Sequence, residues 1–132
     1  MAATIQEFIE KNRITMHAEP TDHNPTMTDA HPMDHWRVTL HVNRRRMMVV
    51  FSQGSGFNGA APELGQVLDC LASDASGAEG RDFEEWASDY GYDSDSRTAE
   101  RTYDAIVTQM RQLGHLLGPD AYAELLHDTE RL

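Results

Sequence analysis

Residues 36–51, WRVTLHVNRRRMMVVF, contain two candidate strands on either side of a short polar turn. In the first half, apolar residues from Trp36 to Val42 alternate with polar ones, which is typical of a strand with one buried and one exposed face. In the second half, Met47 to Phe51 are apolar at every position, which favours a strand covered on both faces. With Asn43 to Arg45 as the turn, the stretch predicts an antiparallel hairpin.

The sequence before this hairpin predicts one helix and a third strand. Apolar residues recur at helical spacing between Ala3 and Lys11, and Asn12 and Arg13 would end that helix. The residues from Ile14 to Ala18 then alternate between apolar and polar, so we expect a strand that stops at Pro20. Residues 21–34 have no sustained period, and we expect a long loop there.

The sequence after the hairpin is helical in pattern. A first helix begins near Pro62 and is interrupted around residues 76–80, and a second begins at Asp82, whose spacing to Glu85 indicates a capping box. The longest helix would be capped by Ser94 or Ser96, and a short helix follows Pro119. The expected inner faces are Leu64, Val67, Leu68 and Leu71; then Phe83, Trp86, Ala87 and Tyr90; then Ala99, Tyr103, Ile106, Met110, Leu113 and Leu117; and finally Tyr122, Leu125 and Leu126.

These elements predict an α+β fold, in which an N-terminal helix and a three-stranded antiparallel sheet precede a C-terminal bundle of about four helices. A chain of 132 residues suits a single domain over residues 1–132. Its longest apolar runs are far shorter than a membrane span, and no signal peptide is recognisable at the N-terminus. Cys70 is the only cysteine, which excludes an intramolecular disulfide, so we expect a cytoplasmic protein.

The charge of the chain is strongly negative and unevenly placed. The formal net charge is −11, and residues 69–104 contain 11 acidic but only three basic residues. Four arginines, in contrast, gather about the predicted hairpin: Arg37, Arg44, Arg45 and Arg46. We therefore expect an acidic helical side and a small basic corner. Such an acidic surface attracts basic proteins, although solubility alone is an alternative reason for the charge.

Other residues that often carry chemistry have simpler interpretations here. Five of the seven histidines lie between residues 17 and 41, and His31, Asp34 and His35 would be the first candidates for a metal site. Their spacing is irregular, so we favour loop and surface histidines and expect no metal or cofactor. Cys70 lies within an apolar stripe, where a thiol is more often buried and inert. We therefore expect a protein that is not an enzyme.

Two stretches carry a family resemblance. VLDCLASDASG (residues 67–77) and DFEEWASDYGYDSDSRTAERTY (residues 82–103) resemble a family of small phage and prophage proteins, mostly of unassigned function. The resemblance spans about residues 49–113 and implies a viral origin. By class, small acidic phage proteins are similar to anti-CRISPR inhibitors, which bind their targets stoichiometrically. This implies a basic host protein or a CRISPR–Cas effector as partner, contacted through Asp82, Glu84, Glu85, Asp89, Asp93 and Asp95.

Two alternatives to an inhibitor remain open from the sequence. One is a phage structural or accessory protein that forms an oligomer, such as a homodimer, through its sheet. The other is a small regulator that binds nucleic acid through Arg44, Arg45 and Arg46 beside Trp36. An exposed hairpin tip, or a sheet edge protected by charge, explains those arginines equally well.

Overall fold

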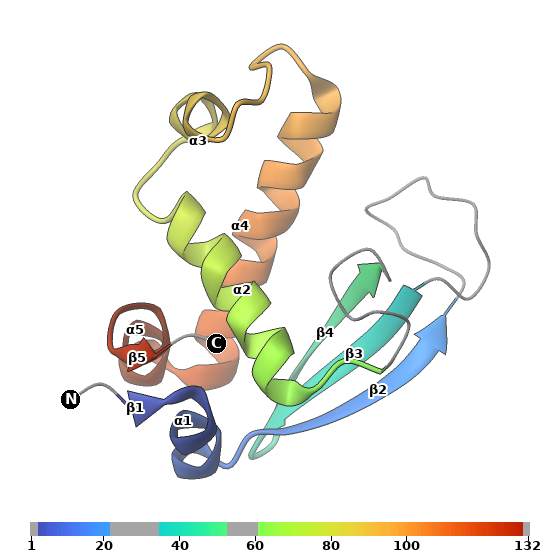
Figure 1. The fold of residues 1–132 in the computed structure, drawn as a ribbon, viewed down its shortest axis with the longest axis vertical. Coiled ribbons are helices and arrows are strands. Elements are labelled where there is room, and N and C mark those ends of the chain that lie inside the picture. Colours follow the sequence, from blue (N-terminus) through green and yellow to red (C-terminus); the bar gives the residue numbers. More distant parts are fainter. Residues whose placement is uncertain (1–2, 22–34, 53–60, 131–132) are drawn as a thin grey trace.

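The computed structural model describes residues 3–21, 35–52 and 61–130, and within them the fold is α+β. Helices and strands lie in the order predicted, with an N-terminal helix, a three-stranded antiparallel sheet and C-terminal helices (Figure 1). The elements are β1 (Ala3–Thr4), α1 (Ile5–Asn12), β2 (Thr15–Thr21), β3 (His35–Val42), β4 (Arg45–Ser52), α2 (Leu64–Ala78), α3 (Phe83–Asp89), α4 (Arg97–Leu117), α5 (Pro119–His127) and β5 (Thr129–Glu130).

The sheet has the strand order β2-β3-β4, with both neighbouring pairs antiparallel. Val38 pairs with Val49 and Leu40 with Met47, and these side chains are buried in the main core. The alternation predicted for β3 is therefore confirmed. The prediction that the next strand is covered on both faces is wrong, because the side chain of Met48 is 56% exposed. Like its neighbour β3, β4 therefore alternates between a buried and an open face.

The first strand of this sheet is longer than predicted. We expected it to stop at Pro20, but β2 continues to Thr21, and Pro20 lies opposite Trp36 of β3. Proline lacks the backbone N–H that an inner strand needs for its second partner, and an edge strand has no such partner. The position of β2 at the sheet edge therefore tolerates the proline.

Helix α1 begins two residues later than its apolar pattern suggested. The hydroxyl of Thr4 accepts a hydrogen bond from the backbone N–H of Glu7 at 3.1 Å, and the Glu7 carboxylate accepts one from the N–H of Thr4, also at 3.1 Å. Ala3 and Thr4 instead form β1, which pairs in parallel with β5. This two-residue pairing brings the two ends of the described chain together (Figure 1). Nothing in the local pattern predicted it.

Helix α2 continues through the predicted interruption and ends at Ala78. Ser76 and Gly77 suggested a break, but Ala75, Gly77 and Ala78 are buried. A Cβ added at Gly77 would lie 2.6 Å from the Tyr90 hydroxyl, so the glycine permits a close approach by that side chain. Tertiary packing thus overrides the weak helix propensity of Gly77.

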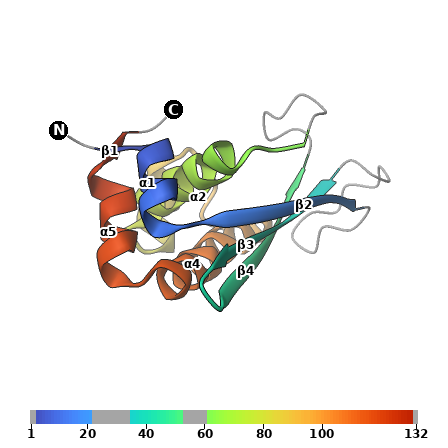
Figure 2. The ribbon, with the colours of Figure 1, turned by 90° about the horizontal axis from the view of Figure 1, so that it is seen from below.

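Two hydrophobic clusters stabilise the described residues. The main core joins the inner face of the sheet to α1, α2, α4 and α5 (Figure 2). The second is small and consists of Ala78, Trp86, Ala87 and Ala99, with Phe83, Tyr103, Ile106 and Met110 packed against it. The predicted stripe of α4 is confirmed, and the helix links both clusters because Met110 packs against each. No described helix is long and apolar enough to cross a membrane.

Candidate acidic interaction surface

Helix α3 carries the predicted acidic surface, and its first turn is fixed by a capping box. The Asp82 carboxylate accepts a hydrogen bond from the backbone N–H of Glu85 at 2.9 Å. In return, the Glu85 carboxylate accepts one from the N–H of Asp82 at 3.4 Å. The capping box predicted from the sequence is confirmed. Two of the predicted acidic residues therefore define where the helix starts and also place negative charge at its positive dipole end.

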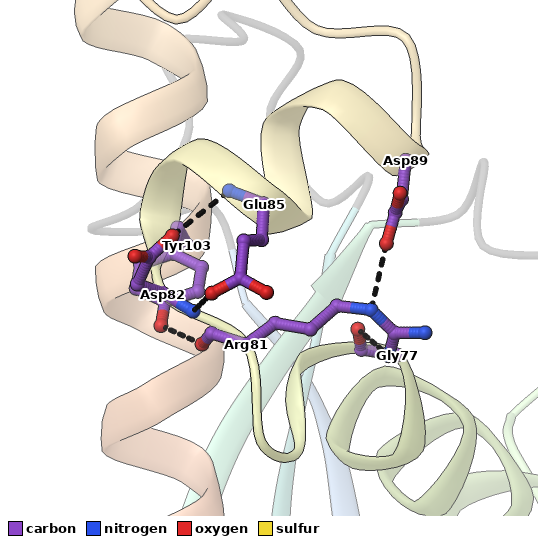
Figure 3. A network of polar contacts seen from close by, with 6 residues as sticks. All are labelled: Gly77, Arg81, Asp82, Glu85, Asp89 and Tyr103. Atoms are coloured by element: carbon purple, nitrogen blue, oxygen red, sulfur yellow. Dashed lines mark hydrogen bonds and ion pairs between the residues drawn. The ribbon is translucent and has the colours of Figure 1, made fainter.

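Arg81 ties α3 to the two long helices (Figure 3). Its Nε donates to Oδ2 of Asp89 at 2.7 Å, and its Nη1 donates to the carbonyl oxygen of Gly77 at 3.0 Å. The Tyr103 hydroxyl, on α4, donates to the Arg81 carbonyl oxygen at 2.6 Å. One residue thus connects the end of α2, the end of α3 and the middle of α4. The same ion pair compensates the charge of Asp89.

Aromatic rings hold the other side of α3 against α4. Trp86 is 4% exposed, and the ring of Tyr92 stacks on it at a centroid distance of 4.8 Å and an interplanar angle of 11°. Phe83 and Tyr103 pack edge to face at 5.7 Å. Tyr90, predicted on the inner face, does pack there: the centroid of its ring lies 6.0 Å from that of Trp86, and its hydroxyl approaches Gly77 of α2. Its side chain is nevertheless 54% exposed, because α3 ends at Asp89 and Tyr90 lies at the helix cap.

All six predicted partner-binding residues are exposed, and they lie on α3 and the segment that joins it to α4. This part of the molecule forms one end of its long axis, away from the sheet (Figure 1). Asp93 accepts a hydrogen bond from the backbone N–H of Asp95 at 2.9 Å, which orders the segment. Asp89 is neutralised by Arg81. We call the remaining five the acidic end, and none of them forms an ion pair with another described residue: Asp82, Glu84, Glu85, Asp93 and Asp95.

The chain matches no family model, no curated protein and no solved structure in comparisons with known proteins. The resemblance to small phage proteins therefore stays a prediction. What the molecule does has to be inferred from the geometry and charge of its own surface.

Two tyrosines of this surface were not predicted as functional residues. Tyr90 and Tyr92 are 54% and 45% exposed, and both belong to the stretch that carries the acidic end. Tyrosine is enriched among the residues that dominate protein interfaces, because it offers a large contact area with little conformational freedom to lose. The sequence signal was available in residues 89–95, DYGYDSD, where two tyrosines lie between acidic residues.

The basic corner is smaller than the sequence suggested. Arg37 forms an ion pair with Glu19 of the neighbouring strand β2, and its Nη1 lies 3.2 Å from Oε1 of Glu19. Trp36 does not lie beside the hairpin arginines, because it pairs with Phe51 at the far end of β3, whereas Arg45 pairs with Val42 next to the turn. Arg44 and Arg46 are exposed. The hairpin turn lies at the other end of the long axis from α3, so the hairpin arginines are separated from the acidic end (Figure 1).

The histidines offer no further site among the described residues. His31 and Asp34 lie outside the part of the chain that the structure describes. His35, expected as a loop or surface histidine, is instead 1% exposed within β3, and that prediction is wrong. It lies on the central strand, opposite Thr21 and Ser52 in the register. No group of three potential metal ligands occurs in the described ranges.

We expect Cys70 to react slowly with thiol reagents. The residue is half-buried rather than fully buried, and desolvation, followed by the charges of Asp74 and Asp69, raises the pKa of its thiol. Because the thiolate is the reactive species, the folded protein should react with iodoacetamide several-fold more slowly than free cysteine at mildly alkaline pH. Replacing Asp74 by asparagine removes one of these charges and should increase the rate. Equal rates for the folded protein and free cysteine would contradict this prediction.

Proposed function

We propose that this chain is a non-enzymatic binding protein whose acidic end docks on a basic, nucleic-acid-binding surface of another protein. In the setting that the sequence resemblance implies, it is a phage-encoded inhibitor of a bacterial defence complex, such as a CRISPR–Cas effector, in the host cytoplasm. One observation carries the proposal. Five exposed carboxylates without a basic partner among the described residues gather at one end of the molecule, where two exposed tyrosines accompany them.

The chemistry of this end suits a groove that normally binds phosphates. Carboxylates present negative oxygen atoms to the same Lys and Arg side chains that contact a nucleic-acid backbone. Opposite charge raises the rate of encounter, and the two tyrosines would supply apolar contact once the surfaces meet. Each free carboxylate also repels nucleic acid, so this end favours a protein as partner.

The attachment of α3 limits the entropy that binding would cost. The Arg81 contacts and the Trp86 cluster fix the helix relative to α2 and α4 before any partner arrives. A surface that is already ordered loses less conformational freedom on association than a disordered acidic tail would. The expected mode is therefore docking of a preformed surface.

The test is a charge reversal that leaves the internal contacts of α3 intact. Glu84→Lys with Asp95→Lys changes two exposed side chains, and spares Asp82, Glu85 and Asp89, whose side chains bond within the protein. Asp128→Lys with Glu130→Lys is the matched control, because it changes the charge equally near β5, away from α3 (Figure 1). The chain is immobilised, bacterial lysate is applied at low and high salt, and each captured protein is assayed for nucleic-acid binding with and without the free chain.

We expect salt-sensitive capture of a nucleic-acid-binding protein, and competition between the chain and nucleic acid for it. The reversal should weaken binding about tenfold or more, and the control by less than about twofold. Inhibition by the reversed variant equal to that of the wild type would refute the role of the acidic end. Capture that yields no protein inhibited in nucleic-acid binding would refute the function itself.

A further inference from the structure

A pocket of about 570 Å³ lies where the sheet meets α4, away from α3. Thr39 of β3 and Met48 of β4 face each other across the strand pair and form part of it. Gln112 contributes from α4. The volume falls in the range of about 300–1,000 Å³ that is usual for small-molecule sites. The pocket is independent of the acidic end, because the two share no residue.

The lining of this pocket is basic in a protein that is strongly acidic. Arg46 enters from β4, and Arg111 and His115 enter from α4, where a spacing of four residues places them on one helix face. None of the described residues that line the pocket is acidic. Neither arginine forms an ion pair or hydrogen bond with another residue in the described ranges. As far as the described residues are concerned, both guanidinium groups are therefore available to an anion.

The rest of the lining is suited to an uncharged, flat group. Met48 is 56% exposed, and its thioether is a favourable contact for an aromatic ring. Thr39 and Gln112 offer a hydroxyl and an amide, which can donate and accept hydrogen bonds. A ligand that fills the pocket would thus join an anionic end to an aromatic, hydrogen-bonding end.

We propose that this pocket binds a nucleoside phosphate, with the phosphate between Arg46 and Arg111 and the base against Met48. Arginine binds phosphate oxygens through two parallel N–H donors, and two arginines from separate elements can hold one phosphate from both sides. The base then lies over Met48, near the polar groups of Thr39 and Gln112. The proposal adds a small-molecule site to the binding protein described above and does not depend on its partner.

The test is titration calorimetry of the full chain with adenosine monophosphate, adenosine, inorganic phosphate and a short single-stranded oligonucleotide. We expect the monophosphate to bind more tightly than phosphate alone and adenosine to show no measurable binding. Arg111→Gln should weaken binding about tenfold, and Met48→Ala should reduce the advantage of the monophosphate over phosphate. Arg101→Gln, an exposed arginine of the same helix outside the pocket, is the matched control and should bind like the wild type.

Several results would overturn the proposal. One is the absence of binding by both the monophosphate and phosphate. Another is equal weakening by Arg111→Gln and Arg101→Gln, which would show a general effect of charge. Binding of the oligonucleotide without binding of the monophosphate would assign the arginines to a nucleic-acid surface instead. Circular dichroism of each variant ensures that a loss of binding is measured on folded protein.

Discussion

Replacement of Phe8 by alanine is expected to lower the free energy of unfolding by about 3–5 kcal/mol, the largest loss we predict in the main core. Phe8 is 0% exposed and is among the largest fully buried side chains of the described residues. It lies on α1, which contacts both α2 and α5. Removing the ring therefore leaves a cavity where the N-terminal helix meets the C-terminal half. Urea denaturation should show a lower midpoint with little change in slope.

The control for this prediction is Lys11→Ala on the same helix. Lys11 forms an ion pair with Glu124 of α5 at 3.0 Å, but its side chain is largely exposed. Exposed ion pairs contribute about 0–1 kcal/mol, so the control should remain close to the wild type. If Phe8→Ala cost no more than Lys11→Ala, burial at the junction of α1 with α2 and α5 would not be a main source of stability.

The predictions that succeeded concern patterns within single elements. The alternation from Trp36 to Val42 gave a strand with one buried face, and the apolar stripe from Ala99 to Leu117 gave the longest helix. Each pattern records the burial of one face, which a strand or helix repeats along its own length. The capping box of Asp82 and Glu85 is also local, because its two residues are three positions apart. These signals were sufficient for the α+β class and the element order.

The predictions that failed depend on what packs against an element. Met48 is apolar but exposed, because it lies on the face of β4 opposite the buried Met47 and Val49. Gly77 lies inside a helix, where the absence of a Cβ permits the close approach of the Tyr90 hydroxyl. His35 is polar but buried in the sheet. In each case residue type was a poor guide, because the deciding neighbour is distant in sequence or belongs to another element.

The two candidate sites, the acidic end and the basic pocket, also differ in whether the sequence could reveal them. The acidic residues of the acidic end are close in sequence, so their clustering was visible before the structure. The pairing of Asp89 with Arg81 was not, because both residues counted simply as members of a charged stretch. The basic pocket was invisible, since Arg46 and Arg111 come from a strand and a helix far apart in the chain. The charged residues of a stretch can be counted in the sequence. Which of these charges form ion pairs, or meet charges from distant segments, is seen only in the structure.

Replacement of Trp86 by alanine should release α3 from the rest of the molecule while the sheet remains folded. Trp86 is the one large buried side chain of the second cluster, and loss of such a ring costs about 3–5 kcal/mol. The cluster is separate from the main core except at Met110, so the loss should be local. In hydrogen exchange, α3 amides should lose protection equivalent to about 3 kcal/mol or more, with β3 and β4 little changed.

The matched control is Tyr92→Phe, which keeps the ring stacked on Trp86 and removes only an exposed hydroxyl. It should change protection of α3 by less than about 0.5 kcal/mol, as surface substitutions usually do. Equal loss of protection in α3 and in the sheet after Trp86→Ala would contradict the separation of the two clusters.

Trp86→Ala also keeps every carboxylate of the acidic end. If it loses partner binding while charge is unchanged, the partner must recognise the fixed arrangement of those carboxylates as well as their number.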